Sequence, residues 1–181
     1  MIEVEVKIRI DDRESVERKI KGMGRFVGEE WQEDIYFDAP HRNFLETGEV
    51  LRVRKIGGEI KLTYKRSKAD EEARVREETE VGVDSPDIVE ILENLGFRQI
   101  AWIKKRRRIY EVGSCKVEID TVEDLGDFVE VEVKLPEGED VGKEIVFKTL
   151  KELGIEGGEV MKKPYLELYL ERVMGCKRSG S

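Results

Sequence analysis

In the stretch MIEVEVKIRI, residues 1–10, apolar and charged side chains alternate without a break from Ile2 onward. Apolar residues occupy the even positions, and the odd positions carry Glu3, Glu5, Lys7 and Arg9. A period of two predicts a β-strand with one oily face and one charged face. Because the charged face mixes acids with bases, the function depends on whether water or a ligand lies against it.

The length and composition of the chain limit which folds and which binding partners are expected. The chain has 181 residues, of which 39% are hydrophobic and 41% charged, and its formal net charge is −8 at pH 7. This length allows a real core, and without a long Ser/Pro linker we expect one domain over 1–175 and a disordered tail over 176–181. So acidic a protein is not expected to bind nucleic acid through its overall field. The richness in Glu, Lys and Arg is typical of thermostable proteins, and equally of a fold that places charge inside.

The cysteines and the lack of long apolar runs exclude two classes of protein, zinc-binding and membrane-spanning. Cys115 and Cys176 lie far apart with no C-x-x-C or His/Cys cluster, so a zinc site is not expected. No run approaches the roughly 20 apolar residues of a membrane span, and no signal peptide is visible. We therefore expect a cytoplasmic protein without a membrane partner.

Alternation like that of the opening stretch recurs along the chain. It predicts about eight strands, over 1–10, 29–38, 48–56, 59–66, 74–83, 97–112, 115–120 and 127–135. Glycine-containing turns at 57–58 and 113–114 predict two hairpins. Amphipathic helices are predicted over 11–24, 85–97, 140–155 and 165–175.

The strands share a charged face opposite an oily one. Amphipathic helices need an apolar partner, so they should cover the oily face. An open sheet of about eight strands curls and leaves edges to protect, whereas closure removes the edges. We therefore expect an α+β fold, a closed eight-stranded antiparallel β-barrel with helices packed outside and charge inside. The alternative is a solvated sheet face laced with cross-strand ion pairs.

The charges on this face suit a chain of phosphates and a metal. The bases are Lys7, Arg52, Arg54, Lys61, Lys65, Lys105 and Arg107. Arginine can bind phosphate through two parallel hydrogen bonds, and lysine acts as a point charge. The acids Glu3, Glu5, Asp120, Glu130 and Glu132 would repel phosphate unless Mg²⁺ or Mn²⁺ stood between them. Within KKRRR (104–108), a slip of one residue would instead turn Lys104, Arg106 and Arg108 inward.

The chain resembles the CYTH superfamily, the triphosphate tunnel metalloenzymes, in an ordered series of motifs. These are EVEVK (3–7), YFD (36–38), LRVRK (51–55), KLTYK (61–65), REETE (76–80), Lys105-x-Arg107, Asp120 and GDFVEVEV (126–133). The run HRNFLETGEVLRVRK (41–55), together with KLTYK, is most similar to the class IV adenylate cyclase branch. The resemblance spans nearly the whole chain and departs at Pro164, where many members have serine before the residue matching Tyr165.

The resemblance implies a tunnel that holds a triphosphate beside a divalent metal. It implies metal binding by Glu3, Glu5, Glu130 and Glu132, and triphosphate binding by Lys7, Arg52, Arg54, Lys61, Lys65, Lys105 and Arg107. It also implies catalytic roles for Lys7, Glu80 and Asp120. Relatives suggest a homodimer.

Three functions remain open at this point. The first is a class IV adenylate cyclase-like enzyme that converts ATP into cyclic AMP and pyrophosphate. The second is a hydrolase of tripolyphosphate or of nucleoside or thiamine triphosphate, and the third is a noncatalytic polyphosphate-binding module. No motif for a covalent nucleophile is present, and phosphoryl chemistry needs none, because metal and bases supply positioning and charge. His41 is interpreted as a loop residue, and Trp31 and Trp102 as packing residues rather than stacking partners for adenine.

Overall fold

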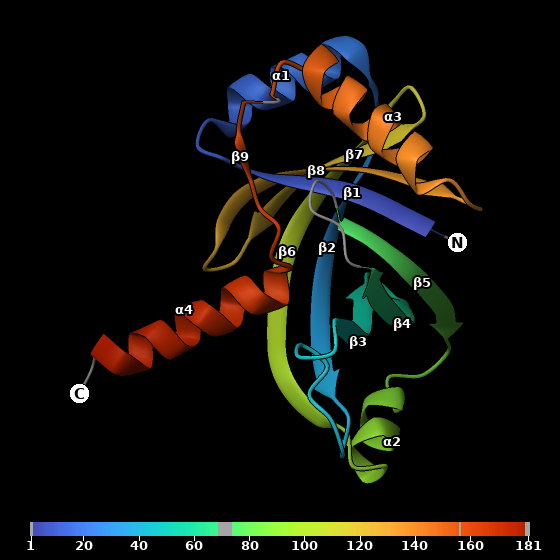
Figure 1. Ribbon diagram of the computed structural model, residues 1–181. Coiled ribbons are helices and arrows are strands. Elements are labelled where there is room, and N and C mark those ends of the chain that lie inside the picture. The colour runs from blue at the N-terminus through green and yellow to red at the C-terminus, as the bar shows by residue number, and fades with distance from the viewer. Residues whose placement is uncertain (1, 69–73, 156, 180–181) are drawn as a thin grey trace.

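The computed structural model describes residues 2–68, 74–155 and 157–179 (Figure 1). All eight predicted strands are present: β1 (Ile2–Ile10), β2 (Arg25–Asp38), β3 (Glu49–Ile56), β4 (Glu59–Lys68), β5 (Arg74–Val83), β6 (Arg98–Val112), β7 (Cys115–Val122) and β8 (Gly126–Leu135). Their order in the sheet is β5-β4-β3-β2-β6-β7-β8-β1, and β1 also pairs with β5. Every pairing is antiparallel, so the predicted closed barrel is confirmed.

β1 closes the ring because it forms hydrogen bonds on both edges. In its first half, Glu3 lies opposite Arg76 of β5, and on the other edge Glu5 lies opposite Glu132 of β8. Beyond the end of β5, Ile8 of β1 pairs instead with the short strand β9 (Glu159–Val160). This ninth strand has two residues, too few to show a period, and the sequence does not predict it.

Two helices cover the oily outer face of β1, β7 and β8 (Figure 1). α1 (Arg13–Met23) begins at an N-cap, Asp12, whose carboxylate accepts a hydrogen bond from the backbone of Ser15. α3 (Glu139–Glu152) approaches β1 so closely that a Cβ on Gly142 would lie 2.7 Å from Val4 Cγ2. The valines and isoleucines of the period-two pattern are therefore buried beneath these helices, which leaves the charged faces of the strands inside the ring.

The other two helices lie at the remaining sides of the barrel. α2 (Ile88–Asn94) packs Leu92 on Ile35 and Val53, and it begins later than the Ser85 start that the sequence predicts. α4 (Tyr165–Ser179) buries its first turn against Phe128 and then points away from the barrel (Figure 1). The helix includes 176–179, which the sequence assigns to a disordered tail, and 180–181 lie outside the described residues. Across the described ranges, no helix has the length and apolarity needed to cross a membrane.

Candidate active site in the barrel lumen

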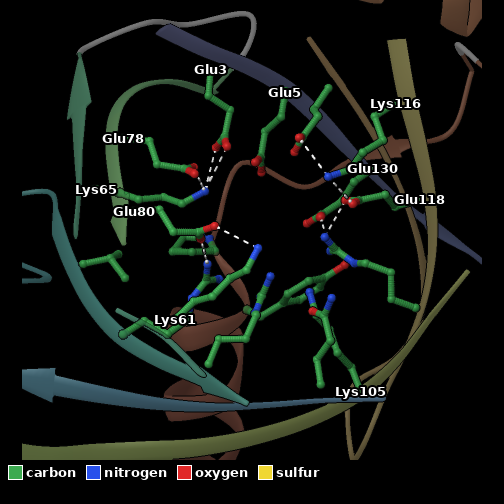
Figure 2. Close-up of a pocket in the computed structure, with 18 of the residues that line it drawn as sticks. Glu3, Glu5, Lys61, Lys65, Glu78, Glu80, Lys105, Lys116, Glu118 and Glu130 are labelled. Atoms are coloured by element: carbon green, nitrogen blue, oxygen red, sulfur yellow. Dashed lines mark hydrogen bonds and ion pairs between the residues drawn. The ribbon is translucent and has the colours of Figure 1, made fainter. Parts of the chain in front are cut away.

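Charged side chains from all eight barrel strands line one internal cavity of about 180 Å³ (Figure 2). The predicted site residues among its lining are Glu3, Glu5, Lys7, Arg52, Arg54, Lys61, Lys65, Glu80, Lys105, Arg107, Glu130 and Glu132. The remaining one, Asp120, is fully buried directly behind Lys105 and Arg107 and accepts hydrogen bonds from both. The fold therefore brings the predicted site residues together and excludes the alternative of a solvated sheet face.

The register of β6 follows the predicted setting. Lys105 and Arg107 are 3% and 5% exposed and reach the lumen, whereas Lys104 is exposed on the outside. Arg108 also faces outward, where it forms ion pairs with Glu17 and Glu29. The slipped register is thus excluded.

Three lumen carboxylates form a cluster suited to a divalent cation. Oxygens of Glu3, Glu5 and Glu132 lie within 4.8 Å of one another. Burial, and then the charge of Glu118, raises the pKa of Glu132 to about 7, so its charged form is disfavoured at this place. A bound cation would offset this by stabilising the ionised carboxylate. Carboxylate oxygens are the ligands that Mg²⁺ and Mn²⁺ prefer, so these residues fit the predicted metal.

The fourth predicted metal ligand, Glu130, is not part of this cluster. Its carboxylate lies 3.0 Å from Lys7 Nζ and 2.6 Å from Arg107 Nη2. Glu130 thus balances two buried cations at the centre of the lumen. Arg107 also contacts Glu118 at 2.5 Å, so this guanidinium is surrounded by carboxylates.

Most lumen bases are already held by a carboxylate. Arg54 donates two hydrogen bonds of 2.6 Å to Asp34, and Lys65 lies 2.9 Å from Glu3. Burial alone would raise the pKa of Asp34, but the guanidiniums of Arg54 and Arg52 hold it well below its usual range. Such pairing is what makes so many buried charges tolerable, because an unpaired buried charge is very costly.

Arg52 is held more loosely than the bases deeper in the lumen. Its guanidinium lies 3.6 Å from Asp34 and 4.0 Å from Glu80, and it donates a 3.4 Å hydrogen bond to Thr63. Lys61 lies 3.3 Å from Glu80 and its side chain is 36% exposed. These two bases can therefore turn toward an incoming phosphate with the least disruption of existing pairs.

One end of the lumen is closed by the first residue of α4. The ring of Tyr165 lies 3.6 Å from Lys7 Nζ and 4.8 Å from Lys105 Nζ, and it meets Phe128 edge-on at 5.1 Å between centroids. At the other end the side chains of Lys116 and Lys134 are 41% and 40% exposed. The lumen therefore has a floor at Tyr165 and a mouth lined by lysines.

Sequence reasoning missed the lumen residues of β2. Glu30, Gln32 and Tyr36 line the cavity, and Asp34 of the same face holds Arg54. The opposite face of this strand mixes Glu29 and Glu33 with Trp31, Ile35 and Phe37, so its alternation is a weaker signal than that of β1. His41 is an exposed loop residue beside Arg42, as interpreted. Trp31 and Trp102 lie outside the lumen, but they are 68% and 52% exposed, so the interpretation of both as packing residues is wrong.

Comparisons with known proteins extend over nearly the whole chain. The sequence model described as "CYTH domain" matches residues 1–165. A Methanocaldococcus jannaschii protein named "Putative adenylate cyclase MJ0240" is 40% identical over 172 residues, which cover 93% of this chain and 98% of that protein. "Adenylate cyclase CyaB" of Aeromonas hydrophila is 31% identical over 135 residues, covering 72% of this chain and 68% of that protein. The solved structure of the PH1819 protein from Pyrococcus horikoshii aligns with a TM-score of 0.84 and 36% identity, covering 94% of this chain and 99% of that one.

Proposed function

Because this chain belongs to the CYTH domain family, we propose that its lumen binds ATP with Mg²⁺ or Mn²⁺ and converts it into cyclic AMP and pyrophosphate. The observation that carries this proposal is the meeting, in one cavity of the barrel lumen, of three clustered carboxylates with several buried bases. The names of two relatives, "Putative adenylate cyclase MJ0240" and "Adenylate cyclase CyaB", support the choice of reaction.

The acidic cluster would hold the metal. Glu3, Glu5 and Glu132 offer oxygen ligands at one place on the β1–β8 wall. When bound there, a divalent cation neutralises phosphate charge and screens the carboxylates from the substrate.

The bases would hold the phosphates and stabilise the leaving pyrophosphate. In the cyclisation, the ribose 3′-oxygen bonds to the α-phosphorus while the bond from that phosphorus to the α,β-bridging oxygen breaks. Charge then grows on the pyrophosphate oxygens, and preorganised cations such as Arg52, Lys61 and Lys65 are suited to stabilise it. Lys7, Arg54, Lys105 and Arg107 complete the proposed triphosphate-binding set.

The residues predicted to be catalytic contact these bases directly. Asp120 orients Lys105 and Arg107 by hydrogen bonds, and Glu80 lies 3.3 Å from Lys61. Glu80 also accepts a 2.9 Å hydrogen bond from Thr63, which fixes its carboxylate at the wall of the lumen. We assign Asp120 and Glu80 the task of positioning, and Lys7 the task of neutralising charge beside Glu130.

Hydrolysis of a triphosphate is the second candidate. The mouth is bordered by exposed lysines, so water can reach the phosphates, and the same bases would stabilise the transition state of its attack on the terminal phosphorus. Phosphate positioning is thus shared by both reactions, and the attacking oxygen distinguishes them.

One assay separates the candidate functions. Purified protein is incubated with Mg²⁺ and either ATP or tripolyphosphate, and cyclic AMP, pyrophosphate and orthophosphate are quantified. Equal amounts of cyclic AMP and pyrophosphate from ATP support the cyclase, and orthophosphate from both substrates supports the hydrolase. Tight binding without any product would leave the noncatalytic module. The homodimer and the cytoplasmic location stay predictions.

A further inference from the structure

Arg76 of β5 lies against two of the three clustered carboxylates. It is 7% exposed and lines the lumen, and in the sheet it lies directly opposite Glu3 of β1. Its Nη2 lies 2.6 Å from Glu3 Oε1 and also forms an ion pair with Glu5 Oε2. The motif REETE includes this arginine, but it is not among the site residues that the family resemblance implies. The guanidinium thus contacts the same oxygens that would hold a divalent cation.

The charge of the acidic cluster is already partly balanced by these contacts. Glu3 also lies 2.9 Å from Lys65 Nζ (Figure 2). Burial would raise the pKa of Glu3, but the charges of Arg76 and then Lys65 hold it below its usual value. A divalent cation brought next to the guanidinium would be repelled by it. The metal can therefore take the cluster only when Arg76 gives up its contacts with Glu3 and Glu5.

Arg76 also has a hydrogen-bond donor that could meet a phosphate. Its buried Nε has no hydrogen-bond partner among the residues that the structure describes. An unmatched buried donor is costly, and guanidinium groups bind phosphate oxygens through two parallel hydrogen bonds. A triphosphate in the lumen would thus offer acceptors that replace the two carboxylates, and would leave those carboxylates available to the metal.

We propose that Arg76 is an internal counter-cation of the acidic cluster, and that its transfer from Glu3 and Glu5 to the triphosphate makes metal and triphosphate bind cooperatively. Each ligand then raises the affinity for the other by the same factor, as thermodynamic linkage requires. The lumen would accordingly select a metal–triphosphate pair over free metal. This inference rests on the proposed function, because it takes the cluster to bind the metal and the bases to bind the phosphates.

The test measures each ligand separately, since tripolyphosphate and Mn²⁺ also bind each other in solution. Calorimetry gives one dissociation constant for Mn²⁺ without phosphate and another for tripolyphosphate in the presence of a chelator. Arg76→Gln removes the charge, and Arg76→Lys keeps it. Arg66→Gln, at an exposed arginine of the neighbouring strand β4, is the matched control.

The two ligands should respond to Arg76→Gln in opposite directions. Mn²⁺ should bind at least about tenfold more tightly than in the wild type, because it no longer has to displace a cation. Tripolyphosphate should bind about tenfold more weakly, because the lumen has lost a charged donor. Arg76→Lys should lie closer to the wild type for both ligands, and Arg66→Gln should change neither more than about twofold. A merely structural role for Arg76 would instead weaken both ligands.

Thermal unfolding gives a second readout. Without metal, Arg76→Gln should melt below the wild type, because Glu3 and Glu5 lose a buried partner. Saturating Mn²⁺ should then raise the melting temperature of Arg76→Gln by more than that of the wild type, since the metal binds the variant more tightly. A variant that folds only when Mn²⁺ is present would support the proposal in the same way.

Several results would overturn this role of Arg76. These are an affinity of Arg76→Gln for Mn²⁺ that is unchanged or weaker, an unchanged affinity for tripolyphosphate, or a variant that stays unfolded in saturating Mn²⁺. If the wild type binds tripolyphosphate and yet one of these results is found, only this inference is wrong. If the wild type binds no triphosphate at all, the proposed function is wrong and the coupling falls with it.

Discussion

Replacing Asp34 by asparagine would remove the charge that holds the buried guanidinium of Arg54. Asp34 is 1% exposed, accepts two hydrogen bonds of 2.6 Å from Arg54, and lies 3.6 Å from Arg52. Removing one partner of a buried pair costs about 3–5 kcal/mol, because the other charge is left uncompensated. We expect Asp34→Asn to lower the free energy of unfolding by this amount at pH 7, measured by urea titration.

The dependence of this loss on pH gives a second, independent reading. The neighbouring arginines hold the pKa of Asp34 below the value of about 3.9 that the residue has in an unfolded chain. A carboxylate with a lowered pKa adds stability above its unfolded value, and that stability is lost as pH falls through its folded value. Asparagine does not titrate. The difference between wild type and variant should therefore be full above about pH 5 and shrink steadily below about pH 4.

The affinity of Asp34→Asn for tripolyphosphate should not fall with its stability. Once released from Asp34, Arg54 has more N–H groups available for phosphate, so tripolyphosphate should bind Asp34→Asn at least as tightly as it binds the wild type. Glu33→Gln, on the outer face of the same strand, serves as control and should change stability by no more than about 0.5 kcal/mol. A loss below about 1 kcal/mol for Asp34→Asn, or a loss that is constant down to pH 2, would refute the reasoning.

Three further results are expected. Glu132→Gln removes one of the clustered carboxylates and should weaken Mn²⁺ binding at least about tenfold, measured by calorimetry. The control Glu90→Gln, at an exposed residue of α2, should leave Mn²⁺ binding unchanged. Equal Mn²⁺ affinities of the two variants would exclude Glu132 as a ligand. Complete chelation of divalent metal should abolish turnover, and excess Mg²⁺ should restore it; activity that survives chelation would contradict the role given to the acidic cluster. Tyr165→Leu should lower the free energy of unfolding by about 3 kcal/mol because it removes the ring that contacts Lys7 and Phe128. Tyr165→Phe should lower the free energy of unfolding by less than about 1 kcal/mol, because the hydroxyl has no hydrogen-bond partner within the part of the chain that the structure describes. If thermal unfolding showed the same loss of stability for the Phe and Leu variants, this reasoning would be wrong.

The barrel and most of its lining could be predicted because the alternation is strict where one face is oily. In β1 every second residue is valine or isoleucine, and β8 carries Val129, Val131 and Val133 in the same alternation, so the charged residues between them have to point inward. The ordered motifs then indicated the family, and through it a triphosphate as the ligand to be tested. The match over residues 1–165 confirms that resemblance.

The sequence could not decide the orientation of strands that are polar or apolar on both sides. In β6 the lumen face carries Ile103 and Ile109 on either side of Lys105 and Arg107, so apolar character does not mark the outside. In β2 the outer face mixes Glu29 and Glu33 with Trp31, Ile35 and Phe37, so the alternation is less regular than in β1. The pairing of β2 with β3, which sets Asp34 opposite Arg54, makes its direction clear.

The partners of individual charges were also beyond the sequence. Glu130 and Glu132 share one face of β8, two residues apart, and look equivalent as metal ligands. Across the sheet, Glu130 lies opposite Lys7, whereas Glu132 lies opposite Glu5. The register of β1 against β8 therefore places a lysine opposite Glu130 and a second glutamate opposite Glu132. The sequence of either strand alone does not predict that register.

The double pairing of β1 has a consequence for biosynthesis. Synthesis proceeds from the amino end, so β1 leaves the ribosome well before its two neighbours in the ring, β5 and β8, have been made. Throughout that interval the nascent strand presents two open hydrogen-bonding edges and an oily face, the features that recruit other chains into aggregates. The alternating charges Glu3, Glu5, Lys7 and Arg9 interrupt this oily segment, and charges so placed are expected to oppose aggregation. Neutralising Arg9, which lies outside the proposed binding set, should therefore lower the yield of folded protein in the cell while the purified variant still binds its ligand.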